Sequence, residues 1–136
     1  MDYEEYQKEC ERIRAENEDL IQIFKTEMEE KGLSPKTIKA HVGNVDLYIN
    51  DFLLREDAEQ MESGLVHLDT FFHFFIRKCM WSTPGNVKTT AASLKKFYKC
   101  MMEHGRIDKE DYQYFCEMLK EGIPIWQEEC AAFNDW

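Results

Sequence analysis

Three lysines share one edge of a helix predicted over residues 84–104. At about 100° per residue, Lys88, Lys95 and Lys99 fall within one narrow arc beside the apolar side of that helix, and Lys96 lies next to the arc. Ammonium groups in such an arc can contact the phosphates of a nucleic acid. A row of lysines is also the ordinary solvent-exposed edge of a helix. The pattern alone leaves both interpretations open.

No other set of residues has the types and spacing of a catalytic or metal site. The sequence contains no nucleophile elbow and no glycine-rich phosphate loop. Cys100 and His104 stand four residues apart, which suits a metal, but a zinc site requires two further ligands at definite spacing. The abundant carboxylates follow the pattern of surface charges and helix caps. We therefore predict a protein that is not an enzyme and has no cofactor, metal site or small-molecule substrate.

The elements that position these residues are predicted to be helices throughout. Gly and Pro are scarce, with 6 and 3 residues, and no stretch alternates apolar and polar residues over the length of a strand. We therefore expect an all-α fold. The predicted helices cover residues 3–31, 32–52, 68–80, 84–104 and 108–122, followed by a short last helix that Pro124 opens. Residues 55–68 are predicted to form a loop or a short helical turn.

The segment from Gly32 to Phe52 organises the chain. Ser34 is a good N-cap, and Pro35 suits the first helical position. Apolar residues then recur at helical spacing, which predicts one helix of about 20 residues. The stripe consists of Ile38, Val42, Val45, Ile49 and Phe52, flanked by His41, Tyr48 and Leu53. We expect the neighbouring helices to pack on it.

Four features outside this helix have a structural interpretation. Asn17 interrupts the apolar stripe of the first helix, which is either a coiled-coil arm or a helix packed along its own bundle. His73 lies within an aromatic run and is interpreted as a core histidine. Trp126, Phe133 and Trp136 either pack the last helix or form an exposed patch. The five cysteines show no CxxC pair and are interpreted as reduced, mostly buried residues.

Length and composition predict one globular domain, with 136 residues of which 43% are hydrophobic. No run of apolar residues is long enough to cross a membrane, and the acidic N-terminus does not resemble a signal peptide. We expect a cytoplasmic protein without membrane contact. The net charge of −10 is uneven: residues 1–30 carry −7, residues 31–100 carry +3, and residues 101–136 carry −6. A mildly basic centre thus lies between two acidic ends.

Two stretches together resemble the N-terminal core-binding domain of the tyrosine recombinase (phage integrase) family. The first is LSPKTIKAH at residues 33–41, followed by Val45, Tyr48 and Phe52. It is similar to the first core helix of that domain, with His41 at the position where the family usually has Tyr. The second is ASLKKFYKCMMEHGRI at residues 92–107, which is similar to a later helix of the domain. The resemblance covers about residues 31–107.

This resemblance implies a compact SAM-like bundle of about four core helices. The acidic segments 1–30 and 108–136 would add a long N-terminal helix and short C-terminal helices to it. In the family, this domain clamps one side of duplex DNA, and a separate domain cleaves the strand. No arginine-histidine-tyrosine constellation of that kind follows residue 107, so we expect no catalytic domain. The implied phosphate contacts are Lys36, Lys39, Lys88, Lys95, Lys96 and Lys99, with Arg77 and Lys78 behind them.

Three functions remain open at the level of the sequence. The resemblance favours a module that binds duplex DNA through its phosphate backbone or assists a recombinase. The net charge and the acidic terminal helices favour a protein-interaction or regulatory module, including self-association through those helices. An acidic mimic of DNA is the third.

Overall fold

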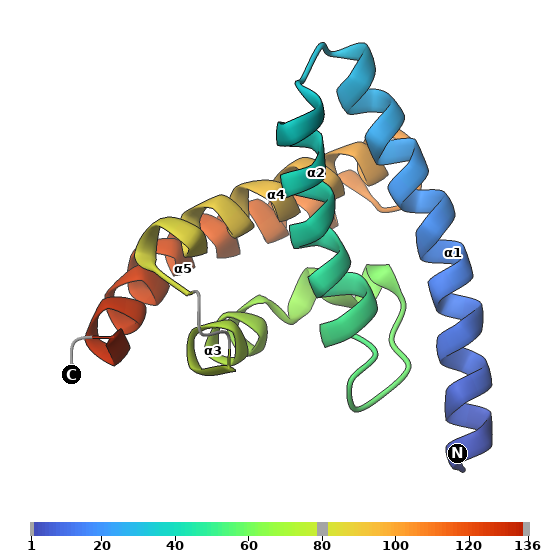
Figure 1. The fold of residues 1–136 in the computed structure, drawn as a ribbon, viewed down its shortest axis with the longest axis horizontal. Helices are drawn as coiled ribbons and strands as arrows, with labels where there is room; N and C mark the ends of the chain where they lie inside the picture. The colour runs from blue at the N-terminus through green and yellow to red at the C-terminus, as the bar shows by residue number, and fades with distance from the viewer. Residues whose placement is uncertain (1, 79–81, 135–136) are drawn as a thin grey trace. The chain divides into compact units, whose positions relative to one another are not determined.

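The computed structural model describes residues 2–78 and 82–134, and every regular element in these ranges is helical (Figure 1). The predicted all-α fold is therefore confirmed. The elements are α1 (Tyr3–Glu30), α2 (Pro35–Asp46), the π-helix η1 (Leu47–Phe52), the 3-10 helix η2 (Met61–Val66), α3 (Leu68–Lys78), α4 (Pro84–Glu103) and α5 (Lys109–Asn134). None of these described helices is both long and apolar enough to cross a membrane.

The chain divides into two compact units, an N-terminal unit of residues 1–64 and a C-terminal unit of residues 65–136. The prediction of one domain with a SAM-like bundle at residues 31–107 stays a prediction.

In the N-terminal unit, α1 and α2 run antiparallel and are joined by a short turn (Figure 1). Gly32 allows this turn because its φ of 80° lies in the left-handed region. The Ser34 hydroxyl then caps α2 by accepting from the Thr37 amide at 3.2 Å, with Pro35 at the first helical position, as predicted. The buried face of α1 consists of Cys10, Ile13, Asn17, Leu20, Phe24 and Met28.

The helix predicted over residues 32–52 has nearly the predicted extent but changes its winding. From Leu47 to Phe52 the backbone is π-helical, and the Leu53 amide donates to the Tyr48 carbonyl at 3.0 Å. The buried Asn17 lies beside this change, where its Nδ2 donates to the Ile49 carbonyl at 3.2 Å and to Asn50 Oδ1 at 2.8 Å. Asn17 therefore interrupts the apolar stripe because it satisfies polar groups of the π-helical turn.

In the C-terminal unit, α4 and α5 run antiparallel along each other, and α3 packs on α5 (Figure 1). Aromatic rings form much of this core. The rings of Phe72 and Trp126 stack with centroids 4.3 Å apart, and those of Tyr98 and Phe115 lie 4.7 Å apart. Such pairs stabilise a core beyond the area that they bury, by about 1 kcal/mol each.

The predicted break between Gly122 and Pro124 is wrong, because α5 continues through both residues to Asn134. Gly122 is buried on the face that packs, and a β-carbon there would overlap the ring of Trp126. The glycine thus admits the tryptophan and does not end the helix. Pro124 cannot donate a hydrogen bond to the Lys120 carbonyl four residues earlier, but both residues lie on the exposed side of α5. We infer that water can satisfy that carbonyl.

Candidate nucleic-acid interface

Helix α4, which carries four of the predicted lysines, has well-defined ends. The Thr83 hydroxyl accepts from the Asn86 amide at 3.0 Å, and Pro84 occupies the first helical position. At the other end, Gly105 has a φ of 72°, and the Arg106 amide donates to the Met101 carbonyl at 2.8 Å. Both ends agree with the helix predicted over residues 84–104. The helix therefore holds its lysines on a regular backbone of 20 residues.

The buried side chains of α4 occupy about half of its circumference. They are Val87, Thr90, Ala91, Ser93, Leu94, Phe97, Tyr98, Cys100 and Met101. Lys88, Lys95 and Lys99 are exposed and lie within about 40° of one another on the other half. The structure therefore brings these three together, and we call them the lysine arc. Lys96 is half-buried and lies farther around the helix.

No side chain in the described part of the protein neutralises the charges of the lysine arc. Among the residues described, no carboxylate forms an ion pair with Lys88, Lys95 or Lys99. The nearest acidic residue along the helix is Glu103, one turn beyond Lys99. An exposed ammonium group in this setting remains available to a phosphate.

The other predicted contact residues lie on other helices. Arg77 is exposed on α3 of the C-terminal unit. Lys78 ends that helix, and its side chain falls outside the part of the chain that is described. Lys36 and Lys39 are exposed near the start of α2, in the N-terminal unit. That these residues join the arc in one surface stays a prediction.

The net charge is divided unequally between the two units. The N-terminal unit has seventeen acidic and eight basic residues, which gives −9, and the C-terminal unit has ten acidic and nine basic residues, which gives −1. Together they account for the total of −10. The lysine arc therefore belongs to a nearly neutral unit, where the electrostatic penalty for approaching a polyanion is small.

His73 belongs to a polar cluster in the C-terminal unit that the sequence did not predict. Its Nε2 lies 3.5 Å from Asp69 Oδ2, and its Nδ1 lies 3.1 Å from Glu129 Oε2. Asp69 Oδ1 also accepts from the Trp126 indole nitrogen at 2.9 Å. The imidazole side chain is 44% exposed, so the prediction of a core histidine is wrong. His73 lies at the edge of the aromatic face of α3, where the carboxylate of Glu129 on α5 contacts its ring.

The chemistry of this cluster fits a structural link better than catalysis. No described hydroxyl or thiol is hydrogen-bonded to His73, so the imidazole does not form a nucleophile–base pair in the parts of the chain that are described. The cluster instead connects α3 to α5. The spacing of Asp69 and His73 could have suggested their pairing, because residues four apart share a helix face. Glu129 is distant in sequence and gave no such signal.

Cys100 and His104, which have a metal-compatible spacing, also have a local structural role. His104 Nδ1 lies 2.9 Å from the backbone oxygen of Cys100, a geometry in which the ring N–H donates to a terminal carbonyl of α4. The described cysteines, Cys10, Cys100, Cys116 and Cys130, form no disulfide, and three of them are buried, as predicted; Cys116 is half-buried. The prediction for Cys79 falls outside the described residues.

Comparisons of the chain with family models, with curated proteins and with solved structures find no match. The resemblance to the tyrosine recombinase family accordingly stays an expectation from the sequence.

Proposed function

We propose that this all-α protein is a non-catalytic module that binds duplex DNA through its phosphate backbone, in the manner that its resemblance to an integrase core-binding domain implies. The observation that carries the proposal is the lysine arc of α4. Its three ammonium groups are exposed, lie on one side of a regular helix and form no ion pair among the described residues. A module of this kind would work alone or beside a recombinase.

The spacing of the lysine arc suits a row of phosphates. Lys88 and Lys95 are seven residues apart and Lys99 follows four residues later, which places them about 10 Å and 6 Å apart along the helix axis. Duplex DNA presents one phosphate on each strand about every 3.4 Å of its axis. A helix lying along the backbone therefore meets a phosphate within reach of each flexible lysine. Lysines acting as point charges favour backbone contact over recognition of bases.

A titration of fluorescently labelled duplex DNA, followed by anisotropy at about 50 mM salt, tests this proposal. We expect binding in the micromolar range, and we expect the double substitution Lys95→Gln and Lys99→Gln to weaken it on the order of tenfold. Each substitution removes one phosphate contact and leaves the buried half of α4 unchanged.

The matched control removes the same number of positive charges at another place in the C-terminal unit. Lys109→Gln with Lys120→Gln alters two exposed lysines of α5. We expect this variant to bind nearly as well as the unmodified protein. Equal weakening by both pairs would show that only net charge matters, and it would contradict a contact at α4.

A second candidate is a protein-interaction module, which the charge of the N-terminal unit favours. Its net charge of −9 suits a basic partner more than a nucleic acid. The two candidates differ in their response to substitution, because a basic protein partner would not require the lysine arc. Absence of DNA binding at low salt would favour this second candidate.

A further inference from the structure

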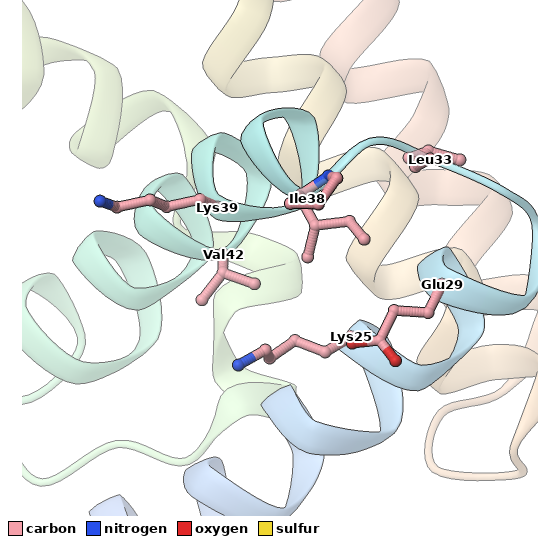
Figure 2. A pocket seen from close by; sticks show the side chains of 7 residues that line it. Lys25, Glu29, Leu33, Ile38, Lys39 and Val42 are labelled. Atoms are coloured by element: carbon pink, nitrogen blue, oxygen red, sulfur yellow. The ribbon is translucent and has the colours of Figure 1, made fainter.

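We infer that the N-terminal unit contains a binding site for a small amphiphilic anion, an apolar molecule that ends in one carboxylate or a similar group. The site is a pocket between the end of α1 and the beginning of α2 (Figure 2). All of its lining residues belong to the N-terminal unit, so it shares no residue with the lysine arc of α4. One of them, Lys39, is also among the phosphate contacts that the resemblance implies.

The pocket has the size and lining of a small-molecule site. Its volume is about 450 Å³, within the range of about 300–1,000 Å³ that is usual for such sites. Four of its seven lining residues are apolar: Leu33, Pro35, Ile38 and Val42. Ile38 and Val42 point from α2 toward α1 (Figure 2). An apolar ligand body could bury its surface against these side chains.

Charged groups at the pocket favour an anion over a cation. Lys25 and Lys39 contribute two ammonium groups, and Glu29 contributes one carboxylate. The pocket lining is therefore positive, although the N-terminal unit as a whole has a net charge of −9. The two lysines differ, because the Lys39 side chain is exposed and extends away from α1 in Figure 2. Lys25 is half-buried and projects into the space between the two helices (Figure 2).

Lys25 is the residue that would recognise the head group of the ligand. Glu29 lies one turn later on the same helix, yet the two form no ion pair, and no other described carboxylate pairs with Lys25. A partly desolvated ammonium group without a counter-ion gains from a bound anion. The apolar wall beside it explains why the anion should carry a hydrocarbon body.

Titrations of the full chain with octanoate, 1-octanol and octylammonium, followed by amide shifts in ¹H–¹⁵N correlation spectra, test this inference. The three probes share an eight-carbon body and differ in the charge of the head group. We expect saturable shifts centred on residues 25–42, with octanoate binding about tenfold more tightly than octanol, as expected for one charged hydrogen bond. Octylammonium should bind more weakly than octanol because of the two lysines.

Two variants locate the site. Lys25→Met keeps most of the apolar stem and should remove the preference for octanoate over octanol, whereas Lys8→Met, about 25 Å away along α1, should leave it intact. Val42→Trp should block all three probes by filling the pocket. Equal binding of octanoate and octanol to the unmodified protein would overturn the assignment of an anion. Absence of saturable shifts, or shifts centred outside residues 25–42, would overturn the site itself.

Discussion

At the scale of single residues, the buried polar groups of the N-terminal unit specify its local structure. Asn17 donates to the π-helical turn, and the Tyr48 hydroxyl donates to the Gly64 carbonyl at 2.5 Å. Both side chains are almost completely buried, at 1% and 0% exposure. A buried polar group that loses its partner costs about 1–3 kcal/mol, so these bonds favour one arrangement of the chain.

Replacing Tyr48 by Phe should lower the free energy of unfolding by about 1–2 kcal/mol at neutral pH, because the Gly64 carbonyl loses this donor. The effect should depend on pH. Burial raises the pKa of Tyr48 above its ordinary value of 10.0. The neutral hydroxyl is thus favoured in the folded state, and its contribution is complete below the pKa of the unfolded chain and decreases as the pH rises above it.

Urea unfolding of both proteins at pH 7, 9 and 11 measures this dependence. The difference in free energy of unfolding between the unmodified protein and Tyr48→Phe should be constant from pH 7 to pH 9 and should shrink at pH 11. Other groups that titrate in this range are common to both proteins and cancel in the difference. A difference that stays constant up to pH 11 would contradict the burial of an un-ionised Tyr48.

At the scale of elements, α5 depends on the close approach of Trp126 to Gly122. The indole ring lies over the glycine, stacks on Phe72 and donates to Asp69. The Gly122→Ala substitution should displace the ring and lower the free energy of unfolding by about 2 kcal/mol, even though alanine favours a helix. Urea unfolding at neutral pH measures the change.

Gly43 supplies the matched control, since it lies in α2 and a β-carbon there would meet no atom within 4 Å. Gly43→Ala should therefore raise the free energy of unfolding by up to about 1 kcal/mol, through helix propensity alone. A stabilising effect of both substitutions would show that the ring adapts easily and would contradict the packing described for α5.

The sequence predicted those elements whose signals are local. The cap at Ser34 and the two ends of α4, at Thr83 and Gly105, each depend on neighbouring residues, and they agree with the predicted cap and with the helix predicted over residues 84–104. The continuity of α5 depends on a ring that packs over a glycine, and the position of His73 depends on Glu129 of another helix. Such tertiary contacts override local signals for a break or a core position, so the sequence could not reveal them.

At the scale of the whole molecule, the division of charge decides what can bind. The N-terminal unit has a net charge of −9 and repels a polyanion. The C-terminal unit, which carries the lysine arc, has a net charge of −1 and repels it little. The clustering of the lysines on α4 followed from the sequence, because residues seven and four apart share a helix face, whereas their contact with DNA is what the resemblance implies. The pocket between α1 and α2 did not, because it arises from the packing of two helices. Because the lysine arc is a positive surface of an otherwise acidic protein, we expect DNA binding to be weak and strongly dependent on salt.

The salt dependence of DNA affinity shows whether the lysines of α4 contact phosphates. Anisotropy titrations of duplex DNA between about 20 and 200 mM salt give the slope of log K against log salt concentration, about −0.9 for each phosphate contact. We predict a slope of about −3 for the unmodified protein, from the three lysines of the arc, and a slope near zero after Lys88, Lys95 and Lys99 are all changed to Gln. An unchanged slope in that variant, or no binding by the unmodified protein at the lowest salt, would contradict DNA binding through α4.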